Sequence, residues 1–327
     1  MLNGQNLKGY YLPLGATNIM TTGHEYDDAF VVWDWTRVPG TTAVANQSTA
    51  DLRWYLFGSN QFGGGVSNAH NGVMAYEHAY QGVEARKAYF FMGDAMVCMG
   101  SGIKAARTQE VRTSVNQCLA NGEVTYGLSG HTYRLTNNLS DKNIDWAYHD
   151  NVGYIFPQNE SVTLRKAKQT GAWRELEVTA SDKPVTKEIF SLWVSHGTTP
   201  QHEDYCYIIM PDKPLSYFTD KKFENEIKII VNSEQIQAIS NENKRQYAAV
   251  FYEPGEIRFA EDLVVAVNKK VIIYIEKKDK QYEIAVADPL YKEQSLQLSM
   301  NGEQINIVFP SGDYSGSSVI KHITEKH

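Results

Sequence analysis

Residues 295–309, SLQLSMNGEQINIVF, carry the pattern that decides the fold of this 327-residue chain. Apolar and polar residues alternate in SLQLSM, Asn301–Gly302 follows, and INIVF returns with the same alternation. A period of two on both sides of Asn–Gly predicts a β-hairpin, because these two residues tolerate the positive φ of a two-residue turn. We therefore expect two antiparallel strands here.

The same alternation recurs through most of the chain. Strand-like runs rich in β-branched and aromatic residues are VVAVN, VIIYIE, YEIAVA, KAYFFMGDAMVCMGSGI, EIFSLWVSHG and YCYIIMP. SVNQCL, followed by Asn121–Gly122 and EVTYGL, predicts a second hairpin. Only residues 72–86, GVMAYEHAYQGVEAR, suggest a short helix. The chain is therefore predicted to be all-β with antiparallel strands.

A charged segment divides the chain into two predicted domains. Residues 211–226, PDKPLSYFTDKKFENE, contain two prolines and precede the strand-like IKIIV. We place the boundary between residues 218 and 219. Residues 1–218 are long for a simple sandwich and suggest two large stacked sheets, whereas residues 219–327 fit a small β-sandwich.

Composition narrows the classes of partner. The net charge of −7 and the pI near 5.7 offer no basic patch for nucleic acid, and no apolar run reaches the roughly 20 residues that span a membrane. Twenty tyrosines and six tryptophans fit a sugar-binding surface. The start, MLNGQNLKGYYLPLG, lacks the basic and apolar regions of a signal peptide. We expect a cytoplasmic protein or a segment that begins inside a longer secreted one.

The cysteines and the glycine run give no cofactor site. Cys98, Cys118 and Cys206 are odd in number and far apart, so we interpret them as small buried apolar residues. FGGGV at residues 62–66 lacks the Lys-Ser or Lys-Thr of a phosphate loop and predicts a turn or bulge. No cofactor is expected.

Residues 23–42, GHEYDDAFVVWDWTRVPGTT, crowd acids beside aromatic residues. His24–Glu25 lacks the second histidine of a zinc protease, because Asp28 stands in its place, and no spaced calcium loop follows, so no metal is predicted. If FVVWDW forms a strand, residues 25–28 lie at its entrance, where carboxylates can orient a cationic group or accept hydrogen bonds from sugar hydroxyls. A solvated acidic turn is the alternative interpretation.

A second polar group lies in WAYHDNVGYIFP, residues 146–157. Asp150–Asn151 predicts a turn at a strand entrance, since both side chains can bond nearby backbone groups. The alternative is that His149, Asp150 and Asn151 form part of the rim of a sugar site.

Taken in order, several stretches resemble the β-half of polysaccharide lyase family 8, which includes hyaluronate, chondroitin AC, chondroitin ABC and xanthan lyases. They are NGQNLKGYYLPLGATNIM, EYDD before VVWDWTRVPGTT, GVEARKAYFFMGDAMVCMGSGI, TSVNQC, WAYHDNVGYIFP, IFSLWVSHGTTP and YCYIIMP. AVFYEPG and AVADP resemble the family's C-terminal domain. The resemblance implies a large antiparallel supersandwich of the galactose mutarotase-like type, followed by a small C-terminal β-sandwich.

The resemblance also implies an activity. Family members cleave uronic-acid-containing polysaccharides, including glycosaminoglycans such as chondroitin and hyaluronan, by β-elimination. Most of their catalytic groups lie on an N-terminal α/α toroid that residues 1–327 do not contain, so we expect this chain alone to be inactive. A full-length protein of this family is expected to be secreted or periplasmic.

The family pattern assigns roles to four residues. Glu25 matches the glutamate that braces the catalytic groups across the cleft, and Asp28 occupies the position of an asparagine near the sugar. His24 and Arg37 are neighbouring candidates for substrate contact. Two alternatives are a non-catalytic carbohydrate-binding β-protein and a sugar epimerase, for which the sequence offers no convincing acid/base pair.

Overall fold

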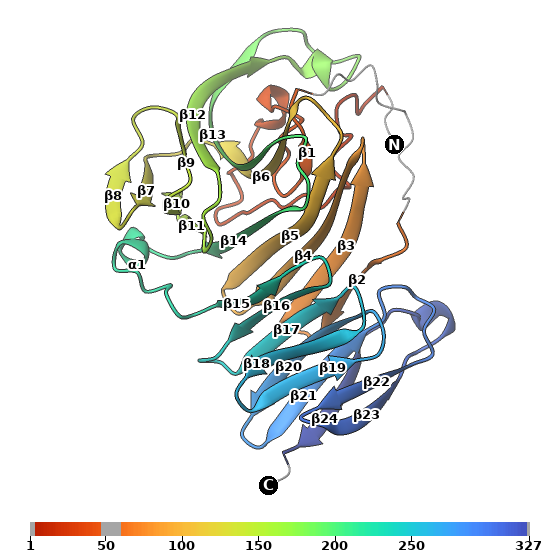
Figure 1. Ribbon diagram of the computed structural model, residues 1–327. Helices are drawn as coiled ribbons and strands as arrows, with labels where there is room; N and C mark the ends of the chain where they lie inside the picture. The colour runs from red at the N-terminus through yellow and green to blue at the C-terminus, as the bar shows by residue number, and fades with distance from the viewer. Residues whose placement is uncertain (1–3, 47–59, 326–327) are drawn as a thin grey trace.

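The fold is built almost entirely from antiparallel strands, as predicted. The computed structural model describes residues 4–46 and 60–325 (Figure 1), so Asn3, the first residue of the N-terminal motif, lies outside them. The described strands form four sheets. No helix among the described residues is long and apolar enough to cross a membrane.

The first two sheets occupy residues 42–211. In spatial order, the five-stranded sheet contains β1 (Thr42–Val44), β6 (Glu110–Leu119), β13 (Val185–Thr198), β12 (Val162–Gly171) and β9 (Leu139–Asp141). The nine-stranded sheet contains β2 (Gly63–Ser67), β3 (Gly72–Tyr80), β4 (Val83–Met92), β5 (Ala95–Ala105), β14 (Glu203–Pro211), β11 (Val152–Ile155), β10 (Ile144–His149), β7 (Val124–Leu128) and β8 (His131–Arg134).

The remaining sheets form the C-terminal part. The six-stranded sheet contains β15 (Lys228–Asn232), β16 (Ile236–Asn241), β17 (Gln246–Phe251), β20 (Val271–Lys278), β21 (Gln281–Ala287) and β24 (Val319–Thr324). The four-stranded sheet contains β18 (Gly255–Ala260), β19 (Leu263–Val267), β22 (Ser295–Met300) and β23 (Glu303–Val308). Short helical turns are η1 (Phe30–Val32), η3 (Trp173–Glu175), η4 (Gly312–Tyr314) and α1 (Leu215–Thr219).

Three apolar cores separate the four sheets, which are stacked in layers (Figure 1). Because side chains alternate along a strand, β4 serves two cores at once. Ala85 and Tyr89 pack into the core shared with the five-stranded sheet. Ala88 and Phe90 pack into the core shared with the six-stranded sheet. The third core lies inside the C-terminal part.

The predicted hairpin at residues 295–309 and the predicted strands VIIYIE and YEIAVA are confirmed. β22 pairs with β23, and β20 pairs with β21, both in antiparallel register. Asn301 and Gly302 adopt φ values of 51° and 85°, as the Asn–Gly turn requires. All three cysteines are free and buried, in agreement with the sequence interpretation.

Four local predictions are wrong, each for a physical reason. Residues 72–86 form β3 and β4 rather than a helix, with the turn at Gln81–Gly82. Asn121–Gly122 does not join a hairpin, because β6 and β7 belong to different sheets. Gly63–Gly65 lie inside β2, where a Cβ on Gly65 would come within 2.9 Å of the Val73 carbonyl oxygen. FVVWDW begins as η1 and is not a strand.

The connection between the second and third sheets contains α1. The boundary predicted between residues 218 and 219 falls within this helix. Phe218 is fully buried against Trp146 in the core that the nine-stranded and six-stranded sheets share. The connection is therefore packed against the protein and is not a free linker.

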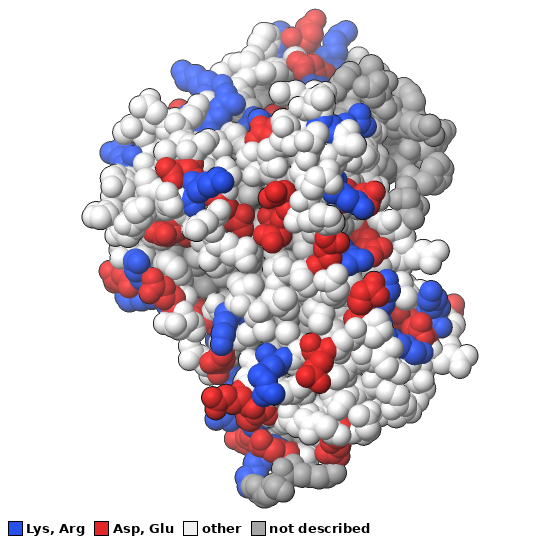
Figure 2. All heavy atoms as spheres, in the orientation of Figure 1, with Lys and Arg blue, Asp and Glu red and all other residues white. Residues whose placement is uncertain are grey.

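Charges of both signs are mixed over the surface. Figure 2 shows lysines and arginines interspersed with aspartates and glutamates on the face in view, with no single large basic region. An acidic polymer that binds this face would therefore have to rely on a few local cations.

Candidate functional site

Glu25 lies in a tight turn that its own carboxylate organises. Oε1 accepts hydrogen bonds from the Thr21 and Thr22 amides at 2.8 and 2.7 Å, and from their hydroxyls at 2.9 and 3.0 Å. Oε2 accepts the Gly23 amide at 3.0 Å. Residues 21–25 therefore wrap around one carboxylate. The two adjacent threonines are the sequence signal for this arrangement.

The electrostatics of Glu25 follow from these donors. Only 3% of the residue is exposed. Burial alone would raise the pKa, but the hydrogen bonds from Thr22 and Thr21 outweigh it and hold the pKa at about 2. Glu25 is thus ionised at neutral pH. Among the described residues it has no cationic partner, so its predicted role in bracing a catalytic group stays a prediction.

Backbone and side-chain bonds fix this turn at the end of β6. The Leu119 amide donates to the Glu25 carbonyl at 2.9 Å. The Tyr26 hydroxyl donates to Asn116 Oδ1 at 2.9 Å, and Asn116 Nδ2 donates to the Tyr154 hydroxyl at 2.6 Å. These contacts join residues 21–28 to both sheets of the first core.

The solvent-facing side of the turn carries three polar residues. The side chains of His24, Asp27 and Asp28 are 78%, 62% and 63% exposed. His24 Nδ1 lies 2.8 Å from Asp27 Oδ2. Asp28 adopts a φ of 54°, a left-handed conformation that aspartate tolerates better than most residues. Of the predicted residues, His24 and Asp28 are the ones accessible to a ligand here.

Lys187 joins this surface from β13. Its Nζ lies 3.9 Å from Asp28 Oδ2, and a third of its side chain is exposed. No sequence pattern predicts this contact, because Lys187 is one of many charged residues and lies far from Asp28 along the chain. It places a positive charge beside a carboxylate that would otherwise repel an acidic sugar.

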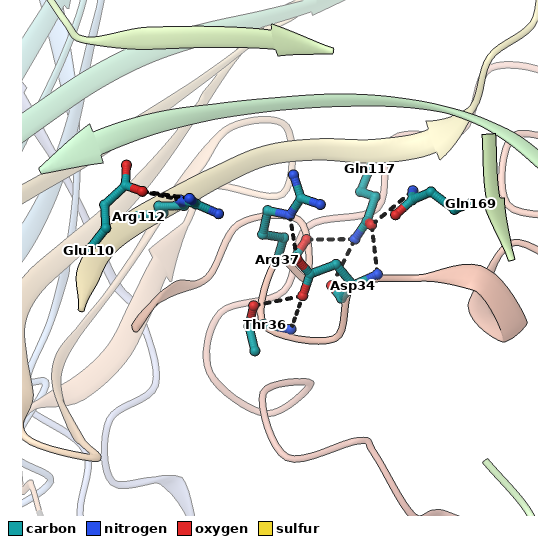
Figure 3. A network of polar contacts seen from close by, with 7 residues as sticks. All are labelled: Asp34, Thr36, Arg37, Glu110, Arg112, Gln117 and Gln169. Atoms are coloured by element: carbon teal, nitrogen blue, oxygen red, sulfur yellow. Dashed lines mark hydrogen bonds and ion pairs between the residues drawn. The ribbon is translucent and has the colours of Figure 1, made fainter. Parts of the chain in front are cut away.

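Arg37 lies elsewhere, in a second polar turn. Its Nε donates to Asp34 Oδ2 at 2.7 Å, and Asp34 Oδ1 accepts the Thr36 amide and hydroxyl at 3.0 and 2.7 Å (Figure 3). Arg37 is 5% exposed, with its guanidinium 4.7 Å from the Trp193 ring centroid. The structure therefore does not bring Arg37 to the turn of Glu25.

Gln117 holds this second turn on β6. Its Nε2 donates to the carbonyls of Asp34 and Arg37 at 3.1 and 2.9 Å, and its Oε1 accepts the Asp34 amide at 2.9 Å (Figure 3). Sequence reasoning missed this residue, since an isolated glutamine gives no motif. β6 thus anchors both turns of the N-terminal segment.

The second polar group forms a hairpin turn, at which Asn151 is exposed. Asp150 and Asn151, with φ values of 49° and 60°, connect β10 and β11, which confirms the turn interpretation. His149 is 1% exposed and stacks on Phe190. Burial and the Lys166 charge lower its pKa to about 4. The described residues contain no group of acids, histidines and cysteines that could hold a metal.

Comparisons with known families agree with the resemblance. Residues 1–222 match the model of the polysaccharide lyase family 8 super-sandwich domain, and residues 228–297 match that of the family's C-terminal β-sandwich domain. Chondroitinase-AC of Pedobacter heparinus is 32% identical over 97% of this chain and 46% of the relative. Hyaluronate lyase of Thermasporomyces composti is 24% identical over 94% of this chain and 40% of the relative.

Solved structures show the same likeness. A chondroitinase AC lyase studied in oligosaccharide complexes superposes with a TM-score of 0.92 and 30% identity, covering 98% of this chain and 49% of that one. A Paenibacillus xanthan lyase gives a TM-score of 0.89 at 19% identity, covering all of this chain and 34% of that one, and thus shares the fold. This chain spans about half, or less, of the length of these relatives.

Proposed function

Because the chain belongs to polysaccharide lyase family 8, we propose that it is the β-portion of a lyase that cleaves a uronic-acid-containing polysaccharide by β-elimination. The polymers that the relatives' names indicate, chondroitin and hyaluronan, are the substrate class. The observation that carries the proposal is the turn of residues 21–28, which is held rigidly at the end of β6 and presents polar side chains to solvent.

β-Elimination defines what such a site must supply. A base removes the proton on C5 of the uronic acid, electrons move to break the bond from C4 to O4, and an acid protonates O4. A positive or hydrogen-bonding group must neutralise the sugar carboxylate, because C5–H is otherwise too weak an acid. The turn offers His24, Asp27 and Asp28, with Lys187 beside them.

In this proposal Glu25 is a positioning residue. Its Oε1 accepts four hydrogen bonds and its Oε2 accepts one, so most of the roughly four lone-pair sites of the carboxylate are occupied by the turn itself. It therefore fixes the turn and contributes a negative charge that a facing cation would sense. Asp28 accepts hydrogen bonds from sugar hydroxyls, while Lys187 reduces its repulsion of a uronate.

The base and the acid belong, in this proposal, to the α/α toroid that the family resemblance implies. His24 is the one imidazole on the accessible side of the turn among the described residues, and its Nδ1 faces Asp27. Apart from Asp27, no described residue with a titratable side chain bonds to it. This observation also supports the second candidate function, a β-protein that binds acidic carbohydrate without cleaving it.

The test compares residues 1–327 alone with the same chain fused to, or mixed with, the toroid of a family member. Chondroitin, hyaluronan and xanthan are offered separately, and the ultraviolet absorbance of the unsaturated product is followed. We expect no product from the chain alone and a steady rise with the toroid. Steady product from the chain alone would refute the assignment of the acid and base to the toroid.

Binding of the same polymers, measured by affinity electrophoresis, separates the two candidates. Binding without cleavage in the presence of the toroid supports the non-catalytic function and overturns the lyase proposal. Neither binding nor cleavage in any arm would overturn both candidates.

A further inference from the structure

Three arginines gather around Trp193 on the five-stranded sheet. Arg37 comes from the N-terminal segment, Arg112 from β6 and Arg165 from β12. The strand register places Trp193 beside Ser114 and Thr163, with Ser195 opposite Arg112 and Ser191 opposite Arg165. We call Arg37, Arg112 and Arg165 the arginine cluster.

The tryptophan ring lies close to two of the guanidinium groups. Arg37 Cζ is 4.7 Å and Arg112 Cζ is 5.3 Å from the Trp193 ring centroid. Both distances are within the range of cation–π attraction. Trp193 is only 8% exposed, so its contacts with the two guanidinium groups are largely shielded from water.

The cluster holds more positive than negative charge. Asp34 pairs with Arg37 at 2.7 Å, and Glu110 pairs with Arg112 through Nε at 2.8 Å (Figure 3). No carboxylate among the described residues pairs with Arg165. Burial lowers the pKa of Arg37, and the charges of Arg112 and Arg165 lower it further, against the opposing effect of Asp34.

Among the described residues, the cluster contains guanidinium donors that have no acceptor. Arg165 Nε is buried and makes no hydrogen bond. Arg37 bonds Asp34 through Nε, and its two Nη groups make no bond to the other residues drawn in Figure 3. Leaving a buried charged donor unpaired is costly, whereas an anion in reach would satisfy it.

We propose that the arginine cluster binds an oxyanion, either a sulfate or a carboxylate, beside Trp193. The planar fork of a guanidinium matches the oxygen spacing of such groups, and contacts of this kind are stronger than neutral hydrogen bonds. Arg165 and the free Nη groups of Arg37 supply the donors. The source is either free sulfate or a sulfate ester or uronate of an acidic polysaccharide.

This site shares no side chain with the turn of Glu25. Arg112 and Leu119 are seven residues apart on β6, which corresponds to about 20 Å at the rise of a strand, whereas Arg37 and Arg165 lie nearer to that turn, level with Gln117. The inference goes beyond the proposed function, because it requires binding and not cleavage. A negative lyase assay would therefore not contradict the anion site. Absence of anion binding would likewise not contradict the lyase proposal.

The first experiment measures thermal unfolding while sodium sulfate is titrated against sodium chloride at matched ionic strength. The variants are Arg165→Gln and, as a control, Arg134→Gln, which removes an arginine that is 65% exposed. Sulfate stabilises many proteins without binding to a specific site. Specific binding is therefore judged from the difference in sulfate response between Arg165→Gln and the other two proteins. We expect a saturable rise in Tm for wild type and control.

The expected change in Arg165→Gln is an apparent sulfate affinity about tenfold weaker, the scale of one lost charge-assisted contact. In sulfate-free buffer this variant should be about as stable as wild type, because Arg165 is only half-buried and has no carboxylate partner among the described residues. An identical sulfate response in wild type and Arg165→Gln would overturn the proposal.

The second experiment identifies the source of the anion through the indole N–H resonance of Trp193. Oligosaccharides of chondroitin sulfate and of unsulfated hyaluronan are compared with sulfate. A shift with either oligosaccharide that is lost in Arg165→Gln supports a polysaccharide contact, and the pair of oligosaccharides separates sulfate from carboxylate. A shift with free sulfate alone supports an inorganic anion site. No shift with any of them refutes the site.

Discussion

Replacing Lys87 by methionine should stabilise the protein at mildly acidic pH and destabilise it near pH 10. Lys87 is fully buried in β4, and its Nζ donates to the Gly40 carbonyl at 2.5 Å. The rings of Tyr89 and Tyr205 lie 5.9 Å from Nζ. No carboxylate pairs with it among the described residues. A buried amine in such surroundings disfavours its charged form.

The magnitude follows from the pKa. Burial lowers the pKa of Lys87 from 10.5 to about 7, although the Cys98 thiol nearby opposes this. Between these values the unfolded chain binds the proton that the folded protein has released, so stability rises with pH across this window. The lowered pKa of Lys87 reduces the free energy of unfolding by about 4 to 5 kcal/mol at pH 6.5 and by about 1 kcal/mol at pH 10.

Methionine removes this cost but also the bond to Gly40. The Gly40 carbonyl would keep only a long contact of 3.4 Å with the Tyr89 hydroxyl. We expect the loss of the Lys87 bond to lower the free energy of unfolding by about 2 kcal/mol. Lys87→Met should therefore be more stable than wild type by about 2 to 3 kcal/mol at pH 6.5 and less stable by about 1 kcal/mol at pH 10.

Guanidinium unfolding followed by tryptophan fluorescence at both pH values measures this difference. Lys168→Met is the matched control, because Lys168 is exposed on β12 and should show no change of sign. If the stability difference between wild type and Lys87→Met does not vary with pH, Lys87 is not the buried titrating group that the structure indicates.

Three further changes test other features. Glu25→Gln leaves five donors around an amide, so it should cost about 1 to 3 kcal/mol at pH 7. Because the Glu25 pKa is held at about 2, below its usual 4.5, this loss should shrink as the pH falls from 4.5 toward 2. Urea unfolding at pH 7 and 3, with exposed Glu256→Gln as control, checks both points, and a pH-independent loss would contradict them. Asp28→Asn should leave Tm unchanged, whereas Asp28→Val should cost about 1 to 2 kcal/mol at a φ of 54°. A valine variant as stable as wild type would show that the left-handed conformation is not imposed. Arg86→Met removes a guanidinium whose Nη1 donates to the Glu234 carbonyl and which lies 5.2 Å from the Tyr252 ring. Amide hydrogen exchange in residues 233–237 should become about tenfold faster, and Lys104→Met is the control. Unchanged exchange would show that the Arg86 contacts do not stabilise the packing of the nine-stranded sheet on the six-stranded sheet.

The strands could be predicted because their signal is local. Alternation and an Asn–Gly turn suffice for β22 and β23 at residues 295–309. The same dipeptide at Asn121–Gly122 predicts a hairpin that does not form. A turn residue determines a change of chain direction, but it does not determine which sheet the next strand joins. At residues 72–86 apolar residues fit both periods, and pairing with β2 and β5 decides for strands.

The candidate site was less predictable, because it depends on distant contacts. Glu25 and Asp28 followed from the family pattern, and the threonines that bond Glu25 precede it directly. Lys187 and Gln117 reach their turns from other strands, which no local pattern indicates. Arg37 follows the acidic turn within the same short segment, yet its ion pair with Asp34 and its packing on Trp193 hold it away from that turn.

The nine-stranded sheet has consequences for dissecting this protein. One side of β4 and β5 faces the five-stranded sheet, and the other faces the six-stranded sheet through Phe90, Val97 and Met99. A truncation after residue 222 would bare this second apolar side to water, and we expect such a fragment to aggregate during expression. Chimeras that exchange the C-terminal part therefore need a donor whose packing surface matches, position by position, the one formed by Ile239, Val250 and Tyr274.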